Sequence, residues 1–379
     1  MATADARELR GAMVNELKRR GVDLEPAIEE VFRTIPREVF LPGAPLERVY
    51  SGDAVITKQD EDGSPISSSS EVGIMIAMAQ LLDVAPGQRI LEIGAGTGYN
   101  AAVLAQLAGE HGAITTIDID AEVAAQARVH LAGAGFNGVA VITADGWRGS
   151  AVNAPYDRIE VTASVADLSP DWIAQLVDGG KIVLPLVLRA GMQAVLGLRK
   201  HGRDLVSTRV VPGGFMRLRG PAGPRPQVRS FDDWSVELGD GVIDSNGMLP
   251  SLLQEPPRFA VAAPLGWEQL ILLALLHGNV TVTRKGHPGV AVGIFDPAGS
   301  LALVELAAPS IAGPLTLVIA FGSDGGQSRL LSTIEDLRTI RLKDLHVVAR
   351  PTGSGAAEGE VVLRRESFTF AFRAARSAS

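Results

Sequence analysis

The sequence contains no cysteine. This absence excludes disulfide bonds, thiolate metal sites and a cysteine nucleophile, and it is typical of a protein that works in a reducing cytoplasm. The six histidines are scattered and include no pair four residues apart, the spacing that lets two imidazoles bind one metal on a helix. We therefore expect neither a metal centre nor a histidine catalyst.

A basic surplus and an uninterrupted apolar run are also missing. The 43 acidic residues outnumber the 35 basic ones, and the net charge of −8 argues against a broad surface for nucleic acid. The most apolar stretch, 306–322, contains Pro309 and Pro314, so it predicts buried strands and not a membrane-spanning helix. The charged N-terminus lacks the apolar segment of a signal peptide. We expect a globular, cytoplasmic protein without a nucleic acid or membrane partner.

Short apolar runs alternate with helical patterns between Arg89 and about Val211. This βαβ alternation predicts a doubly wound α/β fold, in which a mainly parallel sheet binds its ligand at the carboxyl ends of the strands. Two amphipathic helices precede it, one over 7–20 and one from Pro26 to a stop at Pro36.

The chain length of 379 residues suggests two domains. A segment rich in glycine, proline and arginine, 213–226, marks the boundary between an α/β domain over 1–225 and a C-terminal domain over 226–379. In the latter, strand-like runs are mixed with two helix-like segments, 267–276 and 327–340, which predicts an α+β domain.

The strongest local motif is ILEIGAGTGYN, residues 90–100. A buried strand runs there into Gly94, Gly96 and Gly98, and glycine lets the backbone turn sharply and approach a ligand closely. Tyr99 stands where a dinucleotide fingerprint needs its third glycine, and Glu92 precedes the loop. This spacing favours S-adenosylmethionine over NAD, with S-adenosylhomocysteine as the product.

Carboxylates follow the next two predicted strands. Asp118 can accept hydrogen bonds from both ribose hydroxyls, and Asp145 can accept one from the adenine amino group, whereas Asp120 is expected to cap the next helix. Either carboxylate alone could be a turn or cap residue, but their order after the glycine loop predicts a nucleotide site. The predicted cofactor-binding residues are Glu92, Gly94, Gly96, Gly98, Asp118, Asp145 and Gly146.

From about Leu17 to Leu218 the sequence resembles the protein-L-isoaspartate (D-aspartate) O-methyltransferases. The resemblance is carried by LKRRGVDLEPAIEEVFRTIPREVFLP, LEIGAGTGYN, and then DGW, APYD, VTA and LVDGGKIVLP in this order. It implies a class I methyltransferase with a Rossmann-like sheet, S-adenosylmethionine as the methyl donor, and a carboxylate on a peptide or protein as the acceptor.

In that family a serine in a T-I-S-Q-P-Y segment lies beside the acceptor carboxylate. An ungapped count back from LEIG places Ser70 there as the catalytic residue, with Ser68 and Ser69 as substrate-binding neighbours and Ser69 as the alternative if the register shifts by one. The segment reads PISSSSEVG here, so Glu71 and Val72 replace the glutamine and proline. The serines could also cap a helix, with Ser69 or Ser70 at the N-cap.

The changed acceptor segment and the added domain resemble a branch that modifies ribosomally made peptides. We therefore expect methylation of an Asp side chain in a precursor peptide, whose ester then closes to an aspartimide or isoaspartate, with the C-terminal domain recognising the peptide. Repair of L-isoaspartyl residues in damaged proteins is the alternative, and a non-catalytic module that binds cofactor or peptide is another. A carboxylate with a pKa of roughly 4 is ionised near neutral pH, so its attack needs no general base.

Overall fold

The computed structural model shows two compact units. Unit 1 comprises Met1–Pro185, Val195–Thr208 and Phe215–Gly223, and unit 2 comprises Leu186–Ala194, Arg209–Gly214 and Pro224–Ser379. The chain thus passes between the units more than once, whereas the sequence predicted a single boundary between two continuous domains. That predicted boundary, at 225/226, lies outside the described residues. The structure describes residues 5–224, 228–239, 241–244, 246–286, 289–306, 316–355 and 361–374.

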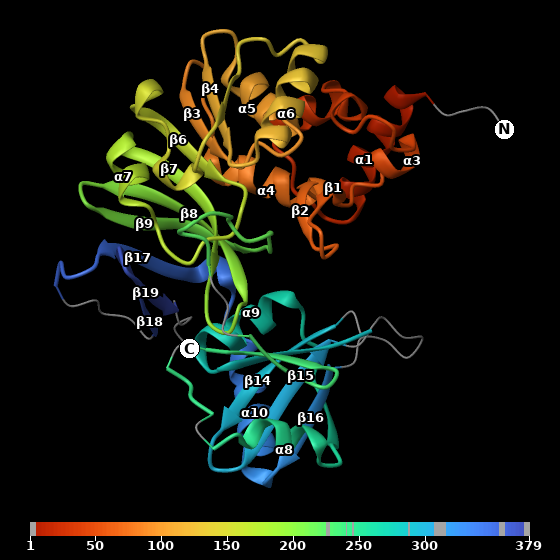
Figure 1. The fold of residues 1–379 in the computed structure, drawn as a ribbon, viewed down its shortest axis with the longest axis vertical. Helices are drawn as coiled ribbons and strands as arrows, with labels where there is room; N and C mark the ends of the chain where they lie inside the picture. Colours follow the sequence, from red (N-terminus) through yellow and green to blue (C-terminus); the bar gives the residue numbers. More distant parts are fainter. Residues whose placement is uncertain are drawn as a thin grey trace. The chain divides into compact units, whose positions relative to one another are not determined.

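The parallel sheet of unit 1 has the strand order β7-β6-β3-β4-β5 (Figure 1). The chain fills one side of β3 with β4 and β5 and then the other side with β6 and β7, so the winding reverses at β3. This confirms the predicted doubly wound α/β class, in which ligands bind where the winding reverses. The strands are β3 (Arg89–Ile93), β4 (Ala113–Asp118), β5 (Ala140–Thr143), β6 (Tyr156–Val161) and β7 (Leu176–Val187), followed by β8 (Gln193–His201) and β9 (Asp204–Pro212), which the sequence did not reveal.

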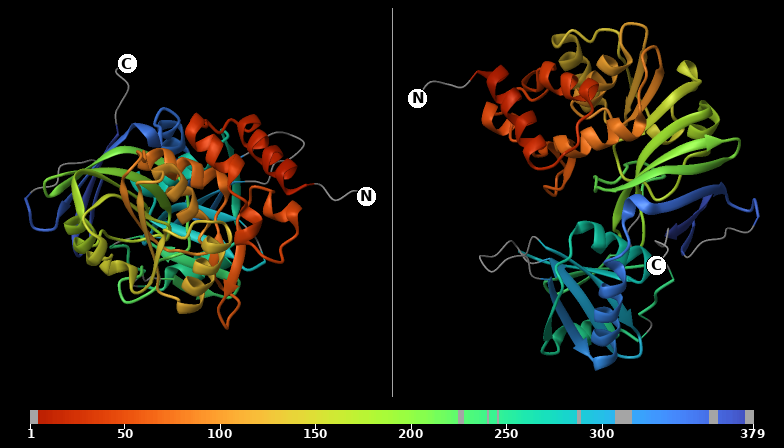
Figure 2. Two further views of the ribbon diagram at one scale, coloured as in Figure 1. Left: turned by 90° about the horizontal axis from the view of Figure 1, so that it is seen from above. Right: turned by 180° about the vertical axis from the view of Figure 1, so that it is seen from behind.

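The helices of unit 1 pack on this sheet and on one another. The helix α5 contacts β3 and β4, α6 contacts β4 and β5, and α4 contacts β6. The N-terminal helices lie beside them, because α2 contacts α4 and α5 (Figure 2). Both predicted N-terminal helices are confirmed, and α2 begins at Pro26, whose fixed φ suits a first helical position. The helices are α1 (Ala6–Arg19), α2 (Pro26–Thr34), η1 (Arg37–Phe40), α3 (Leu46–Val49), α4 (Val72–Leu82), α5 (Tyr99–Ala108), α6 (Ala121–Gly133), η2 (Gly146–Arg148), η3 (Ala151–Asn153) and α7 (Pro170–Gln175).

The serine segment forms a β-hairpin before α4. Strand β1 (Val55–Gln59) pairs antiparallel with β2 (Pro65–Ser69). The N-cap residue of α4 is Glu71, so the alternative that Ser69 or Ser70 caps this helix is wrong. The reason is that the serine backbone up to Ser69 is already committed to pairing with β1, and the helix can begin only after it.

Unit 2 contains a seven-stranded antiparallel sheet with the order β10-β11-β13-β14-β15-β16-β12. The helices α9 and α10 contact β14, and α10 also contacts β15 and β16, whereas α8 packs its leucines on the apolar cluster around Phe295 and Phe321. The predicted α+β class is confirmed. The elements are β10 (Val228–Phe231), β11 (Trp234–Leu238), α8 (Met248–Gln254), β12 (Arg258–Ala262), α9 (Trp267–Leu276), β13 (Val280–Arg284), β14 (Val290–Asp296), β15 (Ser300–Leu306), β16 (Thr316–Gly322), α10 (Asp324–Leu337), η4 (Leu342–Asp344), β17 (Leu345–Pro351), β18 (Val361–Arg364) and β19 (Phe368–Ala374).

The apolar stretch 306–322 contributes the end of β15 and all of β16, in agreement with the predicted strands, while 307–315 lie outside the described residues. Among the helices that the structure describes, none has the length and apolar character to cross a membrane.

Candidate active site

The glycine loop connects β3 to α5 at the carboxyl end of the sheet. Gly94, Gly96 and Gly98 all have positive φ values, of 103°, 51° and 87°. A Cβ atom on Gly94 would also collide with the hydroxyl of Thr162, which is fixed by hydrogen bonds to the carbonyls of Ile93 (3.0 Å) and Gly94 (2.8 Å). The loop therefore requires glycine for its backbone conformation and for its close approach to β6.

Asp118 is the last residue of β4 and faces this loop. Its Oδ2 accepts a hydrogen bond from the Gly96 amide (3.1 Å), and its Oδ1 accepts one from the Asp120 amide (3.0 Å). The side chain of Asp120 accepts hydrogen bonds from the amides of Glu122 and Val123, which confirms that Asp120 caps α6. The chain thus places the Asp118 carboxylate at the loop, where the sequence predicts a ribose contact.

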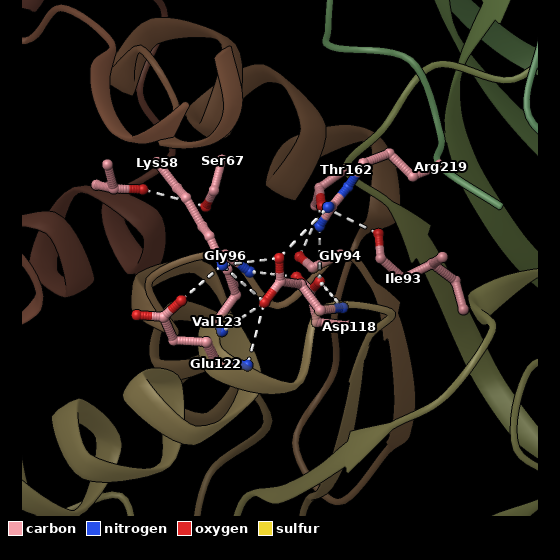
Figure 3. A network of polar contacts seen from close by, with 12 residues as sticks. Lys58, Ser67, Ile93, Gly94, Gly96, Asp118, Glu122, Val123, Thr162 and Arg219 are labelled. Atoms are coloured by element: carbon pink, nitrogen blue, oxygen red, sulfur yellow. Dashed lines mark hydrogen bonds and ion pairs between the residues drawn. The ribbon is translucent and has the colours of Figure 1, made fainter. Parts of the chain in front are cut away.

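Two cations beside these carboxylates were not predicted from the sequence (Figure 3). Arg219 lies 3.5 Å from Asp118 Oδ1 and 3.4 Å from Asp120 Oδ2, and Lys58 of β1 lies 3.0 Å from Asp120 Oδ2 and 2.7 Å from Glu122 Oε2. Burial alone would raise the pKa of Asp120, but hydrogen bonds from Lys58, the Val123 amide and Arg219 outweigh it and lower that pKa to about 2.

Arg219 reaches the site because the segment 215–223 returns to unit 1. The Ser164 amide donates to the carbonyl of Met216, and the Leu218 amide donates to the carbonyl of Ser164, each at 2.8 Å. The sequence predicts a domain boundary in 213–226, and the arginines of this segment gave no sign that one of them would reach Asp118.

Asp145 follows β5 and lies in the neighbouring segment. The Ala144 amide donates to the Asp118 carbonyl (3.0 Å), which ties the two carboxylate-bearing segments together. Asp145 is the N-cap of η2, where its Oδ1 accepts from the Trp147 amide (3.0 Å). A Cβ on Gly146 would lie 2.6 Å from Ile93 Cγ2, so glycine lets this turn pack on the end of β3. The adenine contact of Asp145 stays a prediction.

Glu92 lies beneath the glycine loop. Its carboxylate has no exposed area and accepts hydrogen bonds from Asn100 Nδ2 (2.8 Å) and from the Thr116 hydroxyl. Asn100 also donates to Glu160 Oε2 (2.7 Å), a buried carboxylate on β6 that sequence reasoning missed. Burial raises the pKa of Glu92 to about 8 and that of Glu160 to about 7. Glu92 is thus buried beneath the loop, and its predicted contact with the cofactor stays a prediction.

The serine strand β2 runs against the glycine loop. A Cβ on Gly96 would lie 3.3 Å from the carbonyl oxygen of Ser68. Ser67 and Ser69 are buried, whereas Ser68 and Ser70 are half-buried. The Thr57 hydroxyl donates to Ser67 Oγ (3.1 Å). The predicted acceptor segment and the predicted donor loop are therefore adjacent.

The part of the chain that carries these segments is similar to known proteins. The family model of protein-L-isoaspartate(D-aspartate) O-methyltransferase (PCMT) matches residues 8–217, more than half of the chain. The protein-L-isoaspartate O-methyltransferase of Koribacter versatilis is 36% identical over 211 residues, which cover 56% of this chain and 90% of that protein. That of Thermotoga maritima is 36% identical over 209 residues, which cover 55% of this chain and 65% of that protein.

A solved structure of a protein-L-isoaspartate O-methyltransferase aligns with a TM-score of 0.54 at 24% identity. The alignment covers 89% of this chain and 96% of that one. Because unit 1 accounts for little more than half of the chain, the likeness of fold must extend into unit 2.

Proposed function

The chain belongs to the protein-L-isoaspartate(D-aspartate) O-methyltransferase family, whose methyl donor is S-adenosylmethionine, and we propose that it methylates the free carboxylate of L-isoaspartyl residues in peptides or proteins. The observation that carries this proposal is the contact between the serine strand and the glycine loop, within the part of the chain that the family model spans. The acceptor preference reverses the one favoured from the sequence, because the relatives named above are L-isoaspartate enzymes.

The glycine loop, Asp118 and Asp145 fit an adenosyl cofactor. The glycines give the loop its positive φ angles at the carboxyl end of β3, and the Gly96 amide fixes Asp118 at the loop, where it can bind the ribose. The amide of Ala144 ties the segment that carries Asp145 to the Asp118 carbonyl, which suits an adenine contact. When bound, S-adenosylmethionine supplies an electrophilic methyl group. The remaining task of the protein is to hold the acceptor carboxylate in line with it, and such positioning can contribute up to about 7–11 kcal/mol.

Ser70 is the serine best suited to orient the acceptor. Ser69 is only 3% exposed, and its hydroxyl oxygen accepts a hydrogen bond from Arg37 (3.2 Å). Ser70 is half-buried, and within the described residues its hydroxyl makes no hydrogen bond. It can therefore donate to one oxygen of an acceptor carboxylate while the other oxygen attacks. The carboxylate is already ionised near neutral pH, so no general base is needed.

Matched peptides test this proposal. The protein is incubated with labelled S-adenosylmethionine and with two peptides that differ only in one residue, L-isoAsp or L-Asp. We expect label in a base-labile ester on the isoAsp peptide alone, and none with a third peptide that carries Asn at this position. Transfer to the Asp peptide alone would contradict the proposal and favour a dedicated peptide substrate.

The dedicated-peptide function remains the second candidate, because the acceptor segment PISSSSEVG departs from the family pattern. In this case unit 2 would select the peptide. Its sheet carries a cavity of about 350 Å³ beside α8, lined among others by Trp234, Phe259, Arg284 and Phe321. The Arg284 guanidinium lies 5.0 Å from the centre of the Trp234 ring. The lining also contains Glu255 and Glu305, and a mainly apolar cavity with a few charged groups suits a peptide side chain.

A substitution in this cavity separates peptide selection from catalysis. Phe259 is 62% exposed, so Phe259→Ser should leave the fold intact. If unit 2 selects the acceptor, kcat/KM should fall several-fold for a long acceptor protein and stay unchanged for a short peptide. The control is Val228→Ser, at an exposed residue of β10 on the opposite edge of the same sheet. Equal losses for both substrates would exclude a selective role of the cavity. A truncation is unsuitable, since unit 2 includes Leu186–Ala194 and Arg209–Gly214.

A further inference from the structure

Arg37, the first residue of η1, is an arginine with no exposed area. Among the described residues no carboxylate forms an ion pair with it. Burial lowers its pKa, but a guanidinium stays charged in proteins. A buried charge without a counterion is costly to the fold, so the contacts of Arg37 indicate what the fold gains from it.

The hydrogen bonds of Arg37 within the described residues run to the end of the serine segment and to the residues just before β1. Its Nη2 donates to the Ser70 carbonyl (2.9 Å), to Ser69 Oγ (3.2 Å) and to the Asp53 carbonyl (3.3 Å). Its Nε and Nη1 are buried without a hydrogen-bond partner in the same part of the chain. The guanidinium is thus anchored on one side, toward the serines.

The other contact of Arg37 is with the donor side of the site. Its guanidinium carbon lies 5.5 Å from the ring centre of Tyr99, the first residue of α5 after the glycine loop. Tyr99 is itself held by edge-to-face contacts with Phe32 and Phe40. One side chain therefore joins the acceptor serines to the residue that ends the donor loop.

We propose that Arg37 is a positioning residue for methyl transfer, which holds the Ser70 backbone so that the Ser70 hydroxyl faces the acceptor carboxylate. This inference rests on the proposed function of Ser70. Because the hydrogen bond is made to the Ser70 carbonyl, it fixes the residue and leaves its hydroxyl available. Arginine suits this role because its planar guanidinium lies over the Tyr99 ring while Nη2 faces the three acceptors, whereas a lysine ammonium on a flexible stem holds its partners less precisely.

A double-mutant cycle tests the inference on the full-length protein. Arg37→Lys should lower kcat/KM for the isoAsp peptide at least tenfold and change the dissociation constant of S-adenosylmethionine less than twofold. In a Ser70→Ala background the same substitution should lower kcat/KM less than twofold, because Arg37 acts through Ser70. The matched control is Arg10→Lys, at a buried arginine that contacts Tyr50, Glu38 and the Thr34 carbonyl. It should change kcat/KM less than twofold in either background.

The positioning role would be overturned if Arg37→Lys lowered kcat/KM equally in the wild-type and Ser70→Ala backgrounds. An unchanged kcat/KM in the wild-type background would overturn it as well. If Arg37→Lys does not fold, Ser69→Ala replaces it in the cycle, since this change removes the hydroxyl that accepts a hydrogen bond from Arg37 Nη2. Ser69→Ala should cause a smaller loss that also disappears in the Ser70→Ala background, and a loss that persists there would contradict the inference.

Hydrogen exchange gives a readout that does not depend on turnover. The Val72 amide, two residues after Ser70, donates to the Gly52 carbonyl (2.8 Å). Its exchange should be faster in Arg37→Lys than in the wild type and unchanged in Arg10→Lys. If the wild type methylates neither peptide, the proposed function fails, while exchange still decides whether Arg37 holds the segment. Unchanged exchange in Arg37→Lys would overturn the inference.

Discussion

The donor side and the acceptor side of the site are built in different ways. On the donor side, a strand, a glycine loop and a helix follow one another, and Asp118 comes from the adjacent parallel strand. On the acceptor side, a hairpin is held by side chains distant in the sequence, with Arg37 on Ser70 and Lys58 on Asp120. Changes on the donor side should therefore act through local backbone geometry, and those on the acceptor side through long-range contacts.

Gly94→Ala should have the largest effect and tests the local character of the donor side. It forces an L-residue to a φ of 103° and brings a methyl group onto the Thr162 hydroxyl. We expect calorimetry to show at least a tenfold weaker affinity for S-adenosylmethionine, since strain of about 1–3 kcal/mol must be relieved by moving the loop. The control is Gly87→Ala before β3, with a φ of 82° and no atom within 4 Å of the added methyl. Equal affinities for both variants would contradict this view of the loop.

Ser70→Ala tests the acceptor side. A hydrogen bond to a charged group contributes about 1.5–3 kcal/mol, so kcat/KM for the isoAsp peptide should fall roughly 10- to 150-fold. The affinity for S-adenosylmethionine, measured by calorimetry, should not change. Ser69→Ala should lose less activity, because its hydroxyl is engaged by Arg37. The reverse order of losses would place the acceptor hydroxyl on Ser69.

Glu160→Gln tests the buried support under the donor loop. The folded protein keeps the proton on Glu160 up to a pKa of about 7, whereas the unfolded chain releases it near 4.5. Between these values the folded state binds more protons, so ionisation lowers the free energy of unfolding as the pH rises. Urea unfolding should thus show that the free energy of unfolding of Glu160→Gln rises relative to that of the wild type, by up to about 3 kcal/mol between pH 5 and pH 8. A difference that does not vary with pH would contradict the burial of this acid.

Arg219→Gln should have the smallest effect and tests whether a tertiary contact tunes the donor side. S-adenosylmethionine carries a net positive charge, and Arg219 lies beside the carboxylate predicted to bind its ribose. Because the ion pair is partly exposed and worth at most about 1 kcal/mol, its loss should strengthen binding about two- to fivefold, and less at high salt. The control is Arg148→Gln, whose partner is Asp171. Weaker binding would show that Arg219 contacts the cofactor.

The local parts of this protein could be predicted from short segments of the sequence. The apolar runs predicted a mainly parallel, doubly wound sheet, the glycine spacing predicted the loop, and Asp120 was correctly assigned to the cap of α6. These features depend on side-chain periodicity, on positive φ angles and on hydrogen bonds to the nearest amides. All of these depend on residues that are close together in the sequence, so a short segment is enough to predict them.

Contacts between residues distant in the sequence could not be predicted and became visible in the folded chain. The pairing of β1 with β2 placed the serines in a strand and not at a helix cap, and the return of 215–223 brought Arg219 to Asp118. Arg37 in the motif PREVF gave no sign that its guanidinium would hold Ser70, 33 residues later. Such contacts leave no periodic pattern in the sequence, because they depend on how strands pair and where loops return after folding. For this reason the donor loop could be predicted from residues 90–100, whereas the network that holds the acceptor segment could not.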